Sequence, residues 1–450
     1  MSLNVVILAA GKGTRMHSEL PKVIHSLANK PLLQHVLETS QRLNPETTTI
    51  ITGYKTDLVK KSITNHNISW CLQEKQLGTG HAVLQSTSHL SADKTLILYG
   101  DVPLIDALDL QQLLNKVDEG LAILTCNKTK PEGYGRIVRH KEEIIKIVEE
   151  KDCNKEEKKI TEINTGIIAC NTKNLIAWLG QITNNNSQNE YYLTDIVEFA
   201  VKDGLPVHSQ LAQKEISVFG VNSKEDLAEI ERGLQMSKAK LLMSQGVTLL
   251  DPSRIDIRGE LKCGTDVTID VGCIFEGSVT LGANVHLKPY CVLKDCEIKD
   301  GTIVEAYSHI DSSIVGSSSR IGPYARLRPG TSLANNVHIG NFVEIKNSSV
   351  NQGSKINHLS YIGDSEVGQN VNIGAGTITC NYDGVKKHKT IIEDNVFIGS
   401  SSQLIAPVIV GKGATIGAGS TITKNAPEDQ LTLSRSQQKT IFGWHKPEKK

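Results

Sequence analysis

Hydrophobic and polar residues follow two different rhythms along this 450-residue chain. Up to about residue 225, short apolar runs alternate with amphipathic stretches. The clearest predicted strands are Val5–Leu8, Thr48–Ile51, Thr95–Tyr99 and Gly166–Cys170. The clearest predicted helices are Pro31–Leu43 and Leu108–Val117. This alternation favours a Rossmann-like α/β domain with a mostly parallel sheet flanked by helices, and ligands bind such a sheet outside the carboxyl ends of its strands.

One longer helix is predicted over Ser223–Gln245. It begins with a Ser-x-x-Asp pattern at Ser223 and Asp226, and it ends before Gly246. Apolar residues recur between these ends at helical spacing, at Leu227, Ile230, Leu234 and Leu241. We interpret this segment as a linker helix.

Beyond about residue 250 the apolar period changes to six. A first run is Leu261, Val267, Cys273, Val279, Val285 and Cys291. A second run is Val315, Ile321, Leu327, Leu333, Ile339 and Ile345. A third run, after a break, is Ile398, Leu404, Val410, Ile416 and Ile422. A repeat of this kind predicts a parallel β-helix, in which each repeat supplies one flat strand and one corner and stacked aliphatic side chains fill the interior.

The sequence therefore predicts four segments. Residues 1–222 form the α/β domain, 223–246 the linker helix, 247–435 the β-helix and 436–450 a C-terminal tail, of which Lys446–Lys450 is expected to be a disordered basic end.

Composition narrows the range of partners. Lys plus Arg equals Asp plus Glu at 49 each, so no global positive field favours nucleic acid or anionic lipid, and a small-molecule substrate fits better. The nine cysteines include no C-x-x-C pair, which argues against a zinc or disulfide framework and suits a reducing cytoplasm. The apolar run Val5–Ala10 is too short for a membrane span and lacks the basic leader of a signal peptide.

A glycine-containing turn follows the first predicted strand. It reads Leu8-Ala9-Ala10-Gly11-Lys12-Gly13-Thr14-Arg15-Met16, with Pro21-Lys22 shortly after. Glycines allow backbone N–H groups to approach phosphates, and Arg15 and Lys22 can neutralise their charge. Met16 replaces the third glycine of a dinucleotide fold, and the ending of a Walker loop is missing. Taken alone, such a turn is more often an ordinary strand-to-helix connection than a phosphate-binding loop.

Further motifs follow in order along the N-terminal half. They are Gln73, Leu77-Gly78-Thr79-Gly80, Tyr99-Gly100-Asp101-Val102-Pro103, Gly133-Tyr134-Gly135-Arg136, Val148-Glu149, Glu162-Ile163-Asn164-Thr165-Gly166, Glu190-Tyr191-Tyr192-Leu193-Thr194-Asp195 and Gly220-Val221-Asn222. Together with the glycine turn, this series resembles the sugar-nucleotide pyrophosphorylases.

The resemblance implies a site for UTP and the UDP-sugar. Its residues would be Leu8, Ala9, Ala10, Gly11, Lys22, Gln73, Gly78, Thr79, Tyr99, Gly100, Asp101, Gly135, Glu149, Asn164 and Asn222. Of these, Gly11, Gln73, Gly78 and Thr79 would hold uracil and ribose, and Gly135, Glu149 and Asn164 the sugar phosphate.

A magnesium ion is expected in this half of the chain. Asp101 ends a predicted strand, where a carboxylate can hold a hard cation that also touches phosphate, and Asn222 would add a neutral oxygen. A second Mg²⁺ is also compatible with the chemistry. Catalysis would consist of positioning and of charge neutralisation by Mg²⁺, Arg15 and Lys22, without a covalent intermediate. By itself, Asp101 would equally suit a turn-capping role.

Two stretches interrupt the hexad rhythm. Asn341–Lys346 with Asn357–Tyr361 forms the first, and Gly376–Gly384 forms the second, which we predict to be a loop protruding from one coil because hexads resume only near Ile391 or Ile398. Together with the N-terminal motifs, these features resemble the bifunctional N-acetylglucosamine-1-phosphate uridyltransferase and glucosamine-1-phosphate N-acetyltransferase family, nearly end to end. The resemblance implies a left-handed β-helix, a homotrimer with active sites between subunits, and acetyl-coenzyme A as the acetyl donor.

The second chemical site would acetylate an amine. His358 is the candidate base, because an imidazole titrates near neutral pH, and Glu344 would orient it. Arg328 and Lys346 would bind the sugar phosphate, and the resemblance adds Tyr361 and Asn372. Acetyl-coenzyme A would lie along Ala375, Asn381, Tyr382, Ser400, Ala418 and Arg435.

Two other functions stay open at this point. One is a nucleotidyltransferase whose β-helix serves only assembly or regulation, and the other is a binding scaffold. Uniform hexads would favour a scaffold, whereas these hexads are interrupted at polar residues such as His358, Lys346 and Asn381–Gly384.

Overall fold

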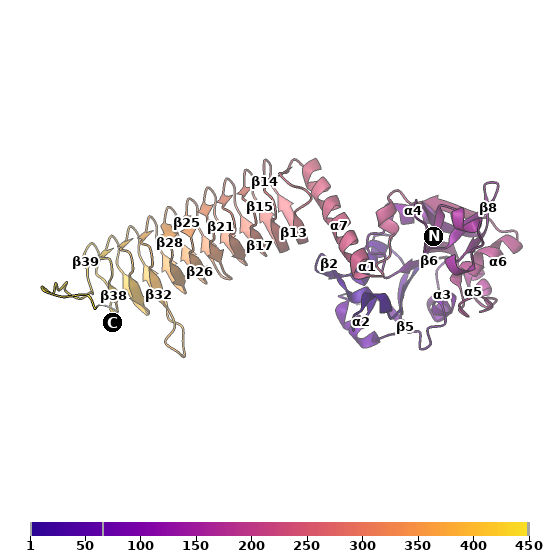
Figure 1. The fold of residues 1–450 in the computed structure, drawn as a ribbon, viewed down its shortest axis with the longest axis horizontal. Coiled ribbons are helices and arrows are strands. Elements are labelled where there is room, and N and C mark those ends of the chain that lie inside the picture. Colours follow the sequence, from indigo (N-terminus) through magenta and orange to yellow (C-terminus); the bar gives the residue numbers. More distant parts are fainter. Residues whose placement is uncertain (1, 65–66, 448–450) are drawn as a thin grey trace. The chain divides into compact units, whose positions relative to one another are not determined.

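The computed structural model describes residues 2–64 and 67–447, and the chain divides into two compact units, 1–234 and 235–450. The four-segment division given above stays a prediction. Each unit is described by itself below, and Figure 1 shows both. No helix in the described part of the chain is long and apolar enough to cross a membrane.

The first unit is built on a twisted, mostly parallel sheet of order β11-β7-β10-β6-β1-β4-β5. Strand β10 runs antiparallel to both of its neighbours in this order, and β8 and β9 form a hairpin attached to it. The strands are β1 (Leu3–Ala9), β4 (Thr47–Thr52), β5 (Ser69–Leu72), β6 (Lys94–Tyr99), β7 (Leu121–Asn127), β8 (Arg136–His140), β9 (Glu143–Val148), β10 (Glu162–Asn171) and β11 (Val207–Leu211). The predicted α/β class is confirmed.

Helices cover both faces of this sheet. They are α1 (Leu32–Gln41), α2 (Thr56–Ser62), α3 (Thr79–Leu84), α4 (Ala107–Asn115), α5 (Thr172–Leu179) and α6 (Ile196–Lys202). Strand β1 is buried on both sides: Val5 and Ile7 pack into one hydrophobic cluster, and Val6 and Leu8 pack into the other. This two-sided burial is why the strand is a continuous apolar run.

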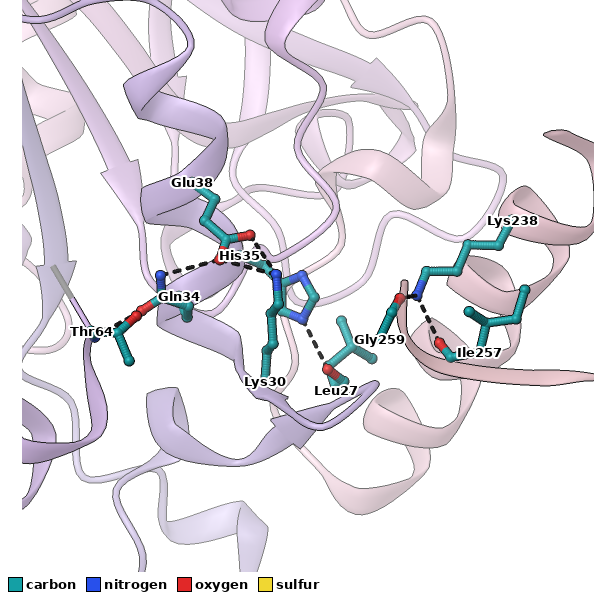
Figure 2. Close-up of polar contacts among 9 residues, drawn as sticks. All are labelled: Leu27, Lys30, Gln34, His35, Glu38, Thr64, Lys238, Ile257 and Gly259. Atoms are coloured by element: carbon teal, nitrogen blue, oxygen red, sulfur yellow. Dashed lines mark hydrogen bonds and ion pairs between the residues drawn. The ribbon is translucent and has the colours of Figure 1, made fainter. Parts of the chain in front are cut away.

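Polar contacts join α1 and the long helix α7 (Lys224–Ser244) to neighbouring strands (Figure 2). On α1, Glu38 pairs with Lys30 at 2.9 Å, and His35 Nε2 lies 2.9 Å from the Leu27 carbonyl oxygen of the short hairpin β2 (Ser26–Leu27) and β3 (Lys30–Pro31). In the second unit, Lys238 of α7 donates to the Ile257 carbonyl oxygen at 2.7 Å.

The second unit is a parallel β-helix (Figure 1). One ladder of strands contains β12 (Thr248–Leu249), β14 (Thr268–Ile269), β16 (His286–Leu287), β19 (Ile303–Val304), β22 (Arg320–Ile321), β25 (His338–Asn341), β28 (Lys355–His358), β31 (Asn372–Ile373), β34 (Phe397–Ile398), β37 (Thr415–Ile416) and β39 (Leu431–Thr432).

The remaining strands form two interleaved ladders within one sheet. They are β13 (Asp256–Cys263), β15 (Ile274–Leu281), β17 (Val292–Lys294), β18 (Glu297–Ile298), β20 (His309–Asp311), β21 (Ile314–Val315), β23 (Arg326–Leu327), β24 (Ser332–Leu333), β26 (Glu344–Lys346), β27 (Ser349–Val350), β29 (Tyr361–Gly363), β30 (Ser365–Val367), β32 (Ile378–Cys380), β33 (Thr390–Ile392), β35 (Gln403–Ile405), β36 (Val408–Val410) and β38 (Thr421–Ile422).

The hexad residues fill the interior of this β-helix. Those of the second and third runs are buried within strands. Most of the first run is buried two residues earlier, at the ends of corners, while the buried strand residues that follow them include Ile269, Phe275 and Leu287. Each repeat therefore has two inward positions, and the first run follows a different one from the later runs.

One coil carries an insertion. Residues 381–389 leave the β-helix between β32 and β33, and a bridge between Tyr382 and Lys387 closes them into a protruding loop (Figure 1). The predicted protrusion is thus present, although its first residues, 376–380, belong to a corner and to β32.

Candidate functional sites

A cavity of about 380 Å³ lies at the carboxyl ends of β1 and β6. The turn after β1 packs closely against Lys22 at Gly13. This residue has φ +67°, and a Cβ there would lie 2.6 Å from Lys22 Cβ. Eleven predicted residues line the cavity: Leu8, Ala9, Ala10, Gly11, Lys22, Gln73, Gly78, Thr79, Tyr99, Asp101 and Asn222. Tertiary structure thus gathers residues from five separate motifs around one cavity.

Two cationic side chains and two side-chain oxygens that accept hydrogen bonds from them meet at one edge of this cavity. The Lys22 ammonium forms an ion pair with the Asp101 carboxylate and donates to Asn222 Oδ1 at 3.1 Å. Arg15 Nη2 donates to the same Oδ1 at 2.9 Å. The oxygens of Asp101 and Asn222 therefore converge on one cation, the Lys22 ammonium, and carboxylate and amide oxygens are of the kind that hard cations bind. Among the described residues, no group of three or more His, Cys, Asp or Glu side chains forms a further metal cluster.

The residues expected around the sugar phosphate form a second group beside Tyr99. The Asn164 amide N–H donates to the Gly135 carbonyl oxygen at 2.8 Å, and Thr194 Oγ1 donates to Glu149 Oε1 at 3.1 Å. Burial raises the pKa of Glu149. Burial, and then the Glu149 and Asp101 carboxylates, also raise the pKa of Tyr99.

Some predicted residues lie outside the lining of the first cavity. They are Gly100, Gly135, Glu149 and Asn164. Gly100 instead joins β6 to β1 through a 2.9 Å hydrogen bond from its N–H to the Leu8 carbonyl oxygen. Arg15 lines a neighbouring cavity of about 300 Å³, which shares Asn222 with the first.

Sequence reasoning missed two polar residues of the cavity wall, Gln76 and Glu190. Gln76 Nε2 donates to the Ala10 carbonyl oxygen at 2.7 Å and so braces the glycine turn. Both residues lie within or beside motifs that were noted, three residues after Gln73 and at the start of the Glu-Tyr-Tyr-Leu-Thr-Asp series.

In the β-helix, six residues form a column along one corner: Asn341, His358, Ala375, Ser400, Ala418 and Arg435. Backbone hydrogen bonds join Leu359 N to Asn341 O (3.1 Å), Gly376 N to His358 O (3.3 Å), Ser401 N to Ala375 O (2.7 Å) and Gly419 N to Ser400 O (2.8 Å). Arg435 Nη1 then donates to the Ala418 carbonyl oxygen at 2.8 Å. The structure therefore places His358 in line with four of the six residues expected to contact coenzyme A, namely Ala375, Ser400, Ala418 and Arg435.

His358 is exposed, and its partner is Asn341. The His358 Nδ1 atom lies 2.8 Å from Asn341 Oδ1. With this oxygen as acceptor, Nδ1 carries the proton and Nε2 is free to accept one. Glu344 was expected to orient His358, but its carboxylate pairs with Arg328 at 2.8 Å and lies 3.8 Å from Arg326. Within one chain, the orienting contact of His358 comes from Asn341.

A cluster of positive charge forms where the inserted loop returns to the coils. Lys387 of this loop lies against Lys346, and the neighbouring ammonium lowers the pKa of Lys387. Lys387 was not predicted, although it lies in the basic run Lys386–Lys389. The Asp364 carboxylate lies close to both lysines and partly offsets their repulsion. Two ammonium groups at one place can bind a phosphate, so the pair is a candidate phosphate site.

The other predicted residues of this site lie on the inserted loop and on strands of the β-helix. Asn381 Nδ2 donates to Asp364, and Tyr382 Oη donates to the Gly384 carbonyl oxygen at 2.5 Å. Tyr361 lies on β29, next to Glu344 in the parallel register of β26 and β29. Asn372 lies on β31, beside the strand that ends at His358.

Fold and sites together define a nucleotidyltransferase joined to a hexapeptide-repeat acyltransferase. Residues 5–162 match the MobA-like NTP transferase domain, residues 257–333 the GMPPB C-terminal domain, and residues 389–424 the bacterial transferase hexapeptide (six repeats).

Three full-length relatives share more than half of their residues with this chain. The chain is 54% identical to the bifunctional protein GlmU of Dechloromonas aromatica and 56% identical to that of Herminiimonas arsenicoxydans, in each case over 99% of both chains. It is also 56% identical to the bifunctional protein GlmU of Methylobacillus flagellatus, over 99% of this chain and 98% of that one. The chain belongs to the GlmU family of bifunctional uridyltransferases and acetyltransferases.

Proposed function

We propose that the two units catalyse consecutive steps on one amino sugar. The β-helix transfers the acetyl group of acetyl-coenzyme A to the amine of glucosamine 1-phosphate. The α/β unit then transfers UMP from UTP to the resulting N-acetylglucosamine 1-phosphate and releases pyrophosphate. The convergence of Lys22, Arg15, Asp101 and Asn222 at one cavity edge is the observation that carries this proposal.

In the uridylyl step, an oxygen of the sugar phosphate attacks the α-phosphorus of UTP. The glycine turn presents backbone N–H groups to the triphosphate, while Lys22 and Arg15 neutralise the charge that develops on it. Because both cations now contact Asp101 or Asn222, they are already held at the phosphate end of the cavity. Gly135, Glu149 and Asn164 would receive the sugar phosphate beside Tyr99.

Asp101 and Asn222 would hold Mg²⁺, since their oxygens already converge on the ammonium of Lys22. The ion would supply further charge neutralisation at the phosphates. Lys22 and Arg15 would then exchange these oxygens for phosphate oxygens.

In the acetyl step, His358 Nε2 removes a proton from the sugar ammonium, and the free amine attacks the thioester carbon while coenzyme A leaves as the thiol. Asn341 fixes the tautomer that leaves Nε2 available. Arg328, held by Glu344, and the Lys346–Lys387 pair would bind the phosphate of the acceptor, with Tyr361 and Asn372 beside it.

The column that begins at His358 offers coenzyme A a path along the coils. Ala375, Ser400 and Ala418 follow His358 in successive coils, and Arg435 closes the column. Asn381 and Tyr382 would contact the same ligand from the inserted loop. A backbone N–H near Ala375 would stabilise the oxyanion of the tetrahedral intermediate.

We also propose that the β-helix assembles as a homotrimer. The same corner carries a column of exposed aromatic rings, Tyr290, Tyr307, Tyr324 and Phe342, stacked at centroid distances of 5.3, 5.0 and 5.3 Å. Such a continuous apolar strip suits burial against a second copy of the chain. All nine cysteines are free thiols, which supports a cytoplasmic location.

An omission experiment tests this function. The purified protein is incubated with UTP, Mg²⁺, glucosamine 1-phosphate and acetyl-coenzyme A, and UDP-N-acetylglucosamine is measured by chromatography. We expect the product only in the complete mixture, and we expect N-acetylglucosamine 1-phosphate to replace both glucosamine 1-phosphate and acetyl-coenzyme A. A protein that consumes no UTP with this acetylated acceptor would contradict the proposal.

A further inference from the structure

The side chain of Gln73 has a fixed orientation in the cavity wall. Gln73 follows β5, is 3% exposed, and places its Nε2 atom 3.0 Å from the Gly78 carbonyl oxygen. A carbonyl oxygen can only accept a hydrogen bond, so the amide atom that faces it must be the NH₂ group. The Gly78 carbonyl group therefore identifies the nitrogen and the oxygen of the Gln73 carboxamide.

His81 accepts a hydrogen bond from the second hydrogen of the same NH₂ group. Its Nδ1 atom lies 3.0 Å from Gln73 Nε2, and Nδ1 must be the acceptor because the amide nitrogen donates. The ring is held on helix α3 beside Tyr191, at a centroid distance of 6.2 Å. Gln85 Nε2 donates to the His81 carbonyl oxygen at 3.1 Å and lies 3.3 Å from His81 Nε2. A neutral imidazole has one acceptor nitrogen, and the shorter contact, to Gln73, assigns it to Nδ1. Both hydrogens of the Gln73 amide are thus engaged by neighbouring protein groups.

The remaining atom of the amide, Oε1, is left for a ligand. It has no hydrogen-bond partner among the described residues, and Gln73 lines the cavity. An oxygen that can only accept favours a base edge that offers an N–H. Uracil offers such a group at N3, whereas the N3 atom of cytosine carries a lone pair and would be repelled.

We propose that His81 is a positioning residue for nucleobase selection, which rests on the function proposed above. Together with the Gly78 carbonyl group, it holds the Gln73 carboxamide so that Oε1 faces the base and selects uracil over cytosine. His81 itself contacts Gln73 and need not touch the nucleotide. Its removal leaves one anchor in place of two and lets the amide turn.

Steady-state kinetics of the full-length enzyme with UTP and with CTP tests this role. The variant His81→Leu removes the acceptor, and His81→Asn retains one near the position of Nδ1. For His81→Leu we expect the ratio of kcat/KM for UTP to that for CTP to fall about five- to tenfold, the equivalent of one hydrogen bond. The KM for UTP should rise while kcat stays close to wild type, and His81→Asn should restore most of the discrimination.

Two controls separate this proposal from simple unfolding. His89→Leu makes the same substitution in the short helix η3 (Thr87–His89), where the side chain is exposed, and should change nothing. Acetyltransferase activity of each variant reports that the chain has folded. An unchanged UTP-to-CTP ratio in His81→Leu, or equal defects in the Leu and Asn variants, would overturn the positioning role. A wild-type enzyme that uses no UTP would instead overturn the proposed function.

Discussion

At the scale of single residues, the two proposed sites depend on different side chains. Asp101 belongs to the nucleotide cavity, and its carboxylate faces Lys22. His358 belongs to a corner of the β-helix, and its ring faces Asn341. These contacts involve no shared residue, so the two activities are expected to respond independently to substitution.

Reciprocal variants test this independence. Asp101→Asn keeps the shape of the side chain and removes its charge, so we expect UDP-sugar formation to fall roughly 100-fold or more with acetylation unchanged. His358→Ala removes the proposed base, so acetylation should fall about 10²- to 10⁴-fold with uridylyl transfer unchanged. Separate assays of the two half-reactions provide the measurement. Loss of both activities in either folded variant would show that the sites are not separate.

A half-buried carboxyl group, that of Asp195, makes stability depend on pH. Burial, with help from the carboxylates of Glu198 and Glu149, raises the pKa of Asp195 from 3.8 to about 6. The folded state therefore favours the neutral acid. Its stabilising contribution is complete below pH 3.8 and is lost as the pH rises through about 6.

The variant Asp195→Asn, which stays neutral, isolates this effect. Relative to the variant, the wild type should lose about 1 to 3 kcal/mol of unfolding free energy between pH 4 and pH 7, since folding partly removes the charged carboxylate from water. Denaturant unfolding followed by the fluorescence of the buried Trp178 measures the difference. A constant difference across this range would contradict the raised pKa.

At the scale of elements, the corners of the β-helix fix where the acetyl-transfer residues lie. Successive coils approach most closely at glycines. At Gly340 an added Cβ would lie 2.0 Å from the carbonyl oxygen of Asn357, the residue before His358. The absence of a side chain at Gly340 is thus what allows the next coil to carry His358 beside Asn341.

The variant Gly340→Ala is expected to displace that coil. We expect a loss of about 1 to 3 kcal/mol of stability from overpacking and a reduced rate of acetylation, with uridylyl transfer retained. Gly180→Ala is the matched control, because its Cβ would find only ordinary contacts, the nearest at 3.6 Å. Thermal unfolding and the two half-reaction assays measure these effects. Full acetylation in the Gly340 variant would show that the corner tolerates a Cβ.

At the scale of the whole molecule, helix α7 belongs to both units. Its Ile230 is buried in a cluster of the first unit, and its Ala239 and Leu242 are buried in the core of the β-helix. The chain can therefore be truncated after the end of this helix to separate the first unit from the β-helix.

A protein comprising residues 1–246 tests whether the first unit acts alone. It retains all residues proposed for the uridylyl step, so we expect UDP-N-acetylglucosamine formation from UTP and N-acetylglucosamine 1-phosphate at a rate within about tenfold of the full chain. No acetylation is expected. A folded fragment, as judged by circular dichroism, that does not use UTP would show that the first site needs the second unit.

Assembly is a second property of the whole molecule. If the aromatic column is buried between copies, Tyr307→Ser together with Tyr324→Ser should lower the molar mass measured by light scattering and weaken acetylation more than uridylyl transfer. Leu108→Ser removes another exposed apolar side chain, one that lies outside the β-helix, and serves as the control. A trimer that persists in the double variant would show that the interface between copies lies elsewhere.

The sequence alone determined both fold classes and most residues of the first cavity. Helix, strand and hexad periods follow from local backbone geometry, and each is visible over a short window of residues. The ordered motifs of the N-terminal half then identified eleven of the residues that line the cavity. What the periods left out were the edge strands β5 and β11, the inner strand β7, and the second inward position of each hexad.

Only the tertiary structure decided which side chains meet. Asn341 contacts His358, 17 residues away, because one full coil separates them. Glu344 is nearer to His358 in sequence, but it lies beyond the corner on the next strand and pairs with Arg328. Lys387 meets Lys346 only because the inserted loop folds back. Coil lengths vary with each shortened corner and each insertion, so the register between coils is set by packing across them and not by the local period.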